Sequence, residues 1–172
     1  MITERVWDEM HKAKNYLLQV EVYGNRKRRL NRRISITIVV ISSLCAISAF
    51  FPDFKWCTIA SSVIVALFTI AKECLPALVQ PESELREMEE IRLFYNDYLQ
   101  KLEKLFTERY DEKSDVDDGK MTERFNRIKK TEKDNESRLD VLSRKIYKKE
   151  RQEIIEQSNA YFNRIYKGIY VK

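Results

Sequence analysis

The feature that most constrains this chain is an uncharged apolar run that directly follows a basic cluster. Residues 34–51 are eighteen successive positions without a charge, and six Lys or Arg residues occupy the eight positions before them. At about 1.5 Å per helical residue, this run extends roughly 27 Å, close to the thickness of the hydrocarbon layer of a bilayer. A second uncharged run, residues 56–71, follows almost at once. The two runs predict a helical hairpin that crosses a membrane twice, with spans at about 34–51 and 56–72.

Two other structures fit the apolar runs less well. A secretory signal peptide has its apolar core near the N-terminus, whereas this run begins at residue 34, behind a charged helical segment. A hairpin buried in a soluble domain needs partners with matching apolar faces, and the rest of the chain is too charged to surround two all-apolar helices. The turn from Pro52 to Lys55 contains Pro and Asp, which break helices, and puts Phe54 and Trp56 at an interfacial position.

The basic cluster predicts the orientation of the hairpin. Positive residues gather on the cytoplasmic side of membrane spans, and the turn between the runs offers only Lys55. Both termini are therefore expected in the cytoplasm. A site for lipid headgroups or nucleotide phosphates is the alternative role for the same residues. The cluster consists of Arg26, Lys27, Arg28, Arg29, Arg32 and Arg33.

The uneven charge of the chain supports this interpretation. Residues 1–80 contain 11 Lys or Arg and 6 Asp or Glu, a net charge of +5, whereas residues 81–172 contain 21 of each kind. The excess positive charge thus belongs to the neighbourhood of the hairpin, which argues against a general surplus for binding nucleic acid.

The remaining segments are expected to be helical, since Gly and Pro occupy only six of the 172 positions. Residues 1–25 predict an N-terminal amphipathic helix. Its apolar side chains recur every three or four residues and share one face: Val6, Met10, Ala13, Leu17 and Val20. This helix could lie on the membrane surface, but packing against other cytosolic helices is preferred because its polar face is not notably basic.

Residues 81–172, after the hairpin of residues 26–80, predict a cytosolic helical or coiled-coil region. Apolar seams run from Leu85 to Phe106 and from Met121 to Ile146, and the second helical stretch extends from about Met121 to Lys167. Residues 82–118 hold 13 acidic and 6 basic side chains, whereas residues 120–151 hold 12 basic and 6 acidic ones. This asymmetry predicts an antiparallel hairpin of an acidic and a basic helix. The fold class expected for the whole chain is therefore an all-α membrane protein.

One side of the second apolar run provides candidate pore-lining residues. Hydroxyl side chains there can support water in a narrow pore, although small and hydroxylated residues also let helices pack closely in lipid. Both roles stay open. Because two helices cannot enclose a channel, a pore requires self-association. The stripe consists of Thr58, Ser62, Val65, Thr69 and Lys72.

The densest basic group outside the hairpin is a candidate phosphate site. Cations beside an aromatic ring such as Tyr147 can hold a nucleotide or a short single strand, and a solvated helix face is the alternative. The group consists of Lys129, Lys130, Arg144, Lys145, Lys148 and Lys149.

Enzyme chemistry, a cofactor and a metal site are not expected from this sequence. The one histidine, His11, has no carboxylate or thiol partner in evident register, and no Gly-rich phosphate loop or nucleophile elbow occurs. The three cysteines have no metal-ligand spacing and lie in or beside apolar runs, where Cys behaves as a small hydrophobe.

The layout of the chain resembles that of a known family. An "AKNYL"-like element from Ala13 to Leu17, a two-span hairpin with a basic flank and a charged helical tail together resemble the SLATT proteins. These are two-transmembrane effectors of bacterial conflict (anti-phage) systems. The resemblance covers essentially the whole chain and is carried by layout and hydropathy, so no functional residue is transferred.

The resemblance implies a homo-oligomeric pore in the bacterial inner membrane. Such an effector would depolarise the cell membrane, as in abortive infection, under the control of a nucleotide or oligonucleotide signal from a partner enzyme. The alternative function is a membrane-anchored helical scaffold that docks a cytosolic partner and does not conduct. A holin-like lysis protein fits less well, because such proteins rarely need a cytosolic tail of this length.

Overall fold

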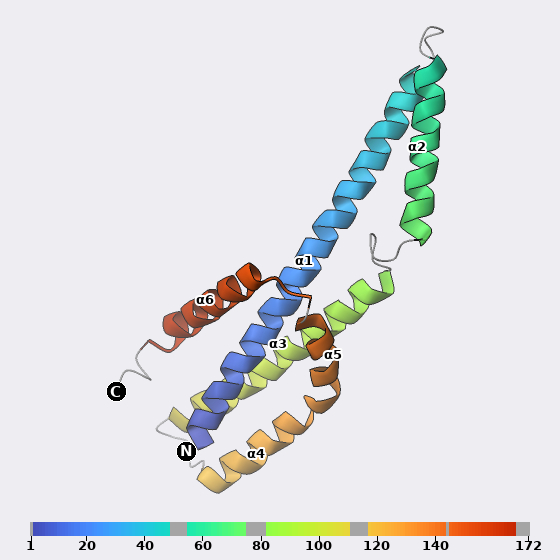
Figure 1. Cartoon of the computed structure of the whole chain (residues 1–172). Coiled ribbons are helices and arrows are strands. Elements are labelled where there is room, and N and C mark those ends of the chain that lie inside the picture. Colours follow the sequence, from blue (N-terminus) through green and yellow to red (C-terminus); the bar gives the residue numbers. More distant parts are fainter. Residues whose placement is uncertain (1, 49–54, 75–81, 111–116, 144, 168–172) are drawn as a thin grey trace. The chain divides into compact units, whose positions relative to one another are not determined.

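The computed structural model describes residues 2–48, 55–74, 82–110, 117–143 and 145–167. Within these ranges the chain is helical and has no strand, so the predicted all-α class is confirmed. Over the same ranges, no helix combines the length and the apolar character needed to cross a membrane. The helices of Figure 1 are α1 (Ile2–Ser48), α2 (Lys55–Cys74), α3 (Glu82–Tyr110), α4 (Asp118–Lys130), α5 (Lys133–Ser143) and α6 (Lys148–Ile165).

Two compact units divide the chain. Unit 1 comprises Met1–Tyr23 and Glu87–Lys172, and therefore contains the first half of α1, most of α3, and α4, α5 and α6. Unit 2 comprises Gly24–Arg86 and contains the second half of α1 and all of α2. The buried hydrophobic side chains of the described ranges all belong to unit 1, whereas twelve of the sixteen large exposed ones belong to unit 2.

The apolar face predicted for the N-terminal helix is buried in unit 1. Val6, Met10 and Ala13 have no exposed surface, and Leu17 and Val20 are at most 5% exposed. These five residues share one core with α3, α4, α5 and α6. The helix therefore packs against other helices of the chain, because its face supplies a continuous apolar stripe at helical spacing.

The first predicted seam, on α3, contributes most of the core. The side chains at this seam recur at spacings of three and four and also widen to neighbouring positions, so α3 can contact more than one helix. Its buried residues are Met88, Ile91, Tyr95, Tyr98, Leu99, Leu102, Leu105 and Phe106. The second seam is buried at Met121, Phe125, Leu139 and Ile146.

The acidic α3 and the basic segment after it run in opposite directions, as predicted. Ion pairs join the end of α3 to α4 and its earlier part to α5. The pairs are Arg109–Asp118 at 3.1 Å, Arg124–Glu108 at 2.5 Å and Arg138–Glu87 at 3.7 Å. Exposed pairs of this kind contribute only about 0.2–1 kcal/mol each, so they select the pairing while apolar burial provides most of the stability.

The stretch from about Met121 to Lys167 is helical, as predicted, but it is divided into three helices. α4 ends at Lys130, and the Thr131 N–H and hydroxyl both donate to the Ile128 carbonyl, at 3.1 and 2.7 Å. The break falls at a polar gap in the apolar pattern. α6 begins after Tyr147, whose N–H donates to Glu150 Oε2 at 2.9 Å. Such local hydrogen bonds compete with the continuous helix and mark the end of α4 and the start of α6.

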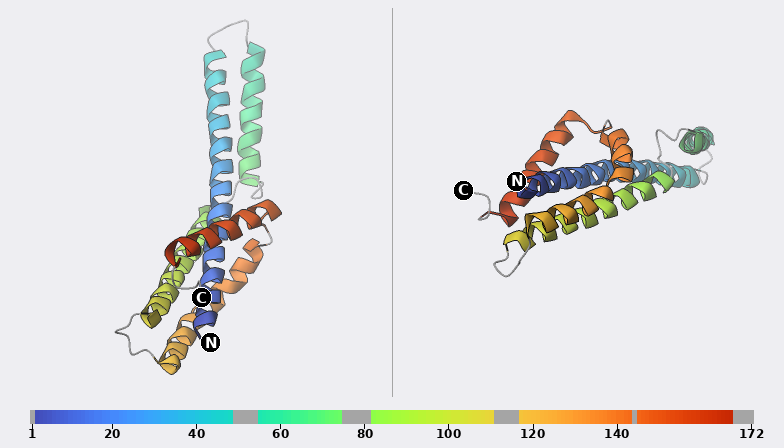
Figure 2. Two further views of the ribbon diagram at one scale, coloured as in Figure 1. Left: turned by 90° about the vertical axis from the view of Figure 1, so that its left-hand side faces the viewer. Right: turned by 90° about the horizontal axis from the view of Figure 1, so that it is seen from below.

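Unit 2 is a pair of antiparallel helices. The second half of α1 and α2 lie side by side in two views (Figures 1 and 2). Their contact is narrow: Ile34, Ile38 and Ile41 of α1 and Val65 of α2 are half-buried, and most other described side chains of the two helices are exposed. The predicted turn, Pro52 to Lys55, falls outside the described residues except for Lys55, where α2 begins.

Candidate functional site

The predicted pore stripe lies on α2 of unit 2. Val65, at its middle, is half-buried, whereas Ser62 and Thr69 on either side of it are exposed. The side chains of Thr58 and Lys72 lie outside the described part of the chain. Val65 is therefore the half-buried member of the stripe, and the two hydroxyl-bearing residues that flank it on the same side of α2 are exposed.

Hydroxyl groups of unit 2 bond to their own helix. Thr37 Oγ1 donates to the Arg33 carbonyl at 3.0 Å, Ser43 Oγ to the Val39 carbonyl at 2.9 Å, and Thr69 Oγ1 to the Val65 carbonyl at 2.9 Å. Thr107 and Thr122 in unit 1 do the same, so the bond is not peculiar to the hairpin. It does mean that these donors are satisfied within the helix, as an apolar surrounding would require.

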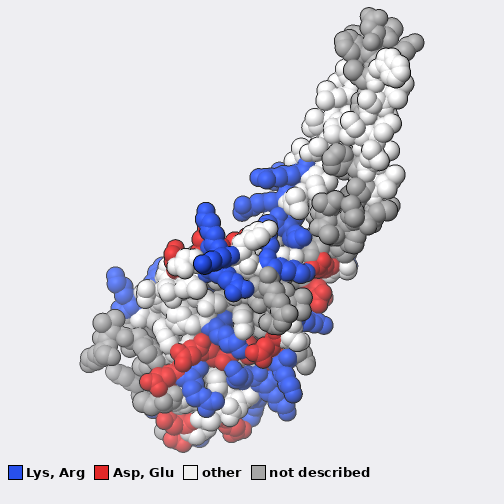
Figure 3. Space-filling model, in the orientation of Figure 1, with Lys and Arg blue, Asp and Glu red and all other residues white. Residues whose placement is uncertain are grey.

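The six residues of the basic cluster lie on α1 within unit 2. Arg28, Arg29, Arg32 and Arg33 are exposed, and Arg26 and Lys27 are half-buried. On the face shown in Figure 3, Lys and Arg side chains project from the middle of α1, and the described atoms of the hairpin beyond them are uncharged. The change from basic to apolar surface thus occurs within one helix.

The six candidate phosphate-binding residues are spread over three segments. Lys129 and Lys130 end α4, Lys145 follows α5, and Lys148 and Lys149 begin α6. The Lys129 ammonium bonds to Glu9, and that of Lys145 lies 5.8 Å from the centre of the Tyr23 ring. Arg144 lies outside the described residues. The charge of Lys129 is therefore balanced within the protein. Lys145, Lys148 and Lys149 are exposed and lie close to one another in the sequence.

A buried polar cluster, which the sequence did not predict, joins α1 to α3 and α4. Glu9 is 7% exposed; its Oε2 accepts from Lys129 Nζ at 2.5 Å and its Oε1 from the Tyr98 hydroxyl at 3.2 Å. Glu132, 2% exposed, lies 3.4 Å from Lys12 Nζ and 3.9 Å from Lys129 Nζ. Two buried carboxylates thus share two lysines.

The environment separates the pKa values of the two carboxyl groups. Burial alone would raise the pKa of Glu9, but the bonded Lys129 ammonium and the nearby Lys12 outweigh it, so the pKa lies below its ordinary value. Burial and the adjacent Glu9 charge raise the pKa of Glu132, and the two lysines offset them only in part. Burial and the negative charge of Glu9 also raise the pKa of Tyr98. Glu9 therefore carries the charge, and Glu132 takes up a proton more readily.

A sequence signal for this cluster does exist. Glu9 stands three residues after Val6 and four before Ala13, in register with the buried face of α1. A charged side chain at that spacing must find a buried partner, because an uncompensated buried charge is strongly destabilising. Which lysine would reach it depends on tertiary packing.

A seam of aromatic rings packs α6 against α1. The His11 ring stacks on Phe162 with centroids 4.0 Å apart, and Trp7 lies 5.2 Å from Phe162 and 5.6 Å from Tyr166. Burial lowers the pKa of His11, and the charge of Asp8 opposes this only in part. A neutral, stacked imidazole is thus a packing element of unit 1.

The comparisons with known proteins add no family. No protein-family model matches the chain, and no curated protein or solved structure matches it either. In the described residues, no group of three or more His, Cys, Asp or Glu side chains could hold a metal ion.

Proposed function

We propose that this chain is a two-span membrane protein that self-associates into a gated pore and depolarises the cell membrane. The observation that carries the proposal is the surface of unit 2. Large apolar side chains are exposed on both of its helices while the charged surface ends within α1. These side chains are Ile36, Val39, Val40, Leu44 and Ile47 on α1 and Trp56, Ile59, Val63, Ile64, Leu67 and Ile70 on α2.

A bilayer is the surrounding that suits such a surface. Monomeric soluble proteins rarely expose contiguous apolar patches larger than a few hundred Å². α2 has 20 residues, which extend about 30 Å, and the complete sequence gives an uncharged run of eighteen residues for the first span. The exposed arginines before that run would lie at the cytoplasmic headgroups, with both termini in the cytoplasm.

The small contact between the two helices of the hairpin supports self-association. Among the side chains that the structure describes in the hairpin, one line is half-buried between α1 and α2, and the exposed faces would contact lipid or other copies of the chain. Ser62 and Thr69 flank Val65 on the same side of α2 and are exposed, and hydroxyl rings formed by several copies could support water in a pore. The role of an anti-phage effector under a nucleotide or oligonucleotide signal rests on the resemblance to the SLATT proteins alone.

The experiment is a measurement of membrane potential with a voltage-sensitive dye in cells that express the chain. We expect depolarisation, and we expect Ser62→Leu with Thr69→Leu to abolish it without preventing insertion. Ser43→Leu is the matched control, since Ser43 is also exposed and bonded to its own helix but lies on α1. A reconstituted protein that stays monomeric and passes no ions in any state would refute the pore.

A membrane-anchored scaffold is the second candidate, and unit 1 favours it. Unit 1 completes its own core from five helices, so it can present a folded surface to a cytosolic partner without a pore. A scaffold would insert as the pore does but would leave the membrane potential unchanged.

A further inference from the structure

Helix α6 crosses α1 in the opposite direction, and the contacts between them define one seam of unit 1. His11 meets Phe162, the Lys14 ammonium lies 4.0 Å from the centre of the Tyr161 ring, and Leu18 clusters with Ile154. As residue numbers rise along α1, those of the partners on α6 fall. Asn15 and Ser158 belong to the same level of this seam.

The seam between α1 and α6 contains polar atoms without partners. Asn15 Oδ1, Gln19 Oε1 and Ser158 Oγ are buried, and none has a hydrogen-bond partner among the described residues. A buried polar atom without a partner is destabilising. On the face of α1 that packs against α3, the buried Glu9 instead accepts hydrogen bonds from Tyr98 and Lys129. The amide oxygens of Asn15 and Gln19, on the side of α1 that faces α6, can accept hydrogen bonds from a ligand.

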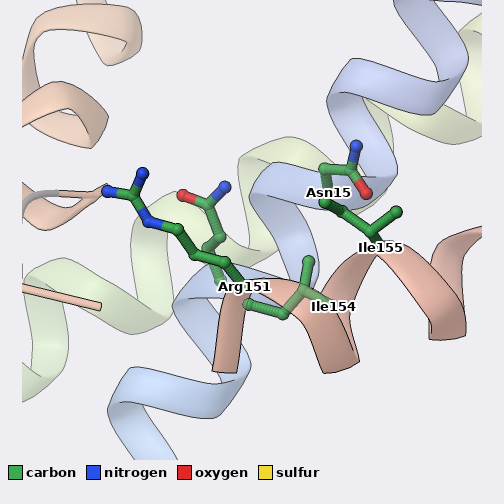
Figure 4. A pocket seen from close by; sticks show the side chains of 5 residues that line it. Asn15, Arg151, Ile154 and Ile155 are labelled. Atoms are coloured by element: carbon green, nitrogen blue, oxygen red, sulfur yellow. The ribbon is translucent and has the colours of Figure 1, made fainter. Parts of the chain in front are cut away.

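A cavity of about 220 Å³ lies beside Asn15 and Gln19. Asn15 and Gln19 of α1 and Arg151, Ile154 and Ile155 of α6 line it. In Figure 4, Arg151 lies at one side of the cavity and Asn15 at the other, with Ile155 beside Asn15 and Ile154 between Arg151 and Ile155. A water molecule occupies about 30 Å³ of the liquid, so the space suits one polar ring and its substituents.

We propose that this cavity binds a small phosphate carried on a ring with hydroxyl or amino groups, as in a sugar phosphate or a nucleoside monophosphate. The two amide oxygens would accept hydrogen bonds from the ring substituents, and the isoleucines would contact the ring face. The exposed Arg151 guanidinium carries five N–H donors and can bind a phosphate beside its contacts within the protein. The site lies entirely within unit 1 and does not depend on the pore.

The test is isothermal titration calorimetry on the purified full chain in mild detergent, with ribose 5-phosphate, AMP, adenosine and inorganic phosphate as probes. We expect the two ring phosphates to bind, and the tighter of them identifies the source. Arg151→Gln should weaken the ring phosphates at least tenfold and leave the affinity for adenosine unchanged. Asn15→Leu with Gln19→Leu should weaken every ring-bearing probe about tenfold and still fold, since apolar groups replace unsatisfied polar ones.

Two variants serve as matched controls. Gln157→Leu removes an exposed amide of α6, and Arg164→Gln removes an exposed cation of its last turn; neither residue lines the cavity. Both should bind like the wild type. The proposal is overturned if no ring phosphate binds at about 10 mM, if all variants bind alike, or if inorganic phosphate binds as tightly as the ring phosphates. Depolarisation by a chain that binds none of the probes would overturn this site and leave the proposed pore intact.

Discussion

Helix α1 belongs to both units, and its two halves differ in the burial of their apolar side chains. Between residues 2 and 23 the apolar side chains form one stripe, and Val6, Met10 and Ala13 have no exposed surface. Between residues 24 and 48 they occupy several faces, and Val39 and Leu44 are 63% and 59% exposed. A stripe at helical spacing can be covered by neighbouring helices, whereas a helix that is apolar on all sides needs an apolar surrounding. The difference lies in the distribution of apolar residues and not in the helix itself.

The comparison predicts that truncating leucine will have very different effects in the two units. Leu102 has no exposed surface in unit 1, whereas Leu67 in unit 2 is 60% exposed. Leu102→Ala should lower the free energy of unfolding by about 2–5 kcal/mol through lost burial and a cavity. Leu67→Ala should change it by less than about 0.5 kcal/mol. Urea denaturation of the full chain in detergent measures both, with Trp7 fluorescence reporting unit 1 and Trp56 fluorescence reporting unit 2, each tryptophan being read with the other replaced by Phe.

The loss of stability measured for Leu67→Ala distinguishes a hairpin that stands alone from one that contacts other copies of the chain. A loss at Leu67 as large as that at Leu102 would contradict the exposure seen in one chain and would place Leu67 in a contact between copies. Equal and small losses at both positions would contradict the core of unit 1.

Replacing an exposed leucine of unit 2 with arginine tests whether lipid surrounds this unit. Leu67→Arg should disfavour membrane insertion by about 3 kcal/mol, because an arginine near the middle of a span must leave water. Leu93→Arg is the matched control in unit 1, where the leucine is 56% exposed, and should change stability by less than about 0.5 kcal/mol. Alkaline extraction of cell membranes measures the integrated fraction. Full integration of the Leu67→Arg variant would mean that this face of α2 does not contact lipid.

The features that the sequence predicted well depend on helical periodicity. The stripe from Val6 to Val20 and the seam on α3 are buried because spacings of three and four translate directly into one face of a helix. The breaks at Thr131 and before α6 were missed, since they depend on local hydrogen bonds that compete with the helix.

The polar features were missed for a different reason. The sequence marks Glu9 as an acid on an apolar face, but the choice of Lys129 as its partner depends on how α4 meets α1. The cavity between α1 and α6 combines residues more than 130 positions apart, such as Asn15 and Ile154, and no local pattern pairs them. Long-range packing therefore determines both the partner of Glu9 and the set of residues that line the cavity.

Charge provides the next contrast between the units, because unit 1 buries Glu132 while the arginines of unit 2 are exposed. The raised pKa of Glu132 means that the folded state still holds a proton at pH values where the unfolded state, with a pKa near 4.5, has released it. Stability from this group therefore falls as pH rises through that range. Glu132→Gln should raise the free energy of unfolding near neutral pH, by about 1.4 kcal/mol for each unit of pKa difference, and should have no effect below the unfolded value.

Unfolding curves over a pH series measure this difference. Arg29→Gln, in the exposed basic cluster of unit 2, should leave the pH dependence unchanged. If Glu132→Gln instead lowers stability near neutral pH, the ion pairs of Glu132 with Lys12 and Lys129 outweigh its burial and its repulsion by Glu9.

The smallest expected effect concerns the ion pairs that set the direction of α4 against α3. Arg124→Gln removes the contact to Glu108 and should lower stability by about 0.2–1 kcal/mol, less at high salt, because its side chain is 46% exposed. Arg127→Gln is the matched control, since Arg127 pairs with Glu123 inside α4 and bridges no helices. A double-mutant cycle of Arg124 and Glu108 measures the coupling. A coupling as large as the Leu102→Ala loss would mean that charge, and not apolar burial, holds α4 on α3; a coupling near zero at all salt concentrations would mean that charge does not even select the pairing.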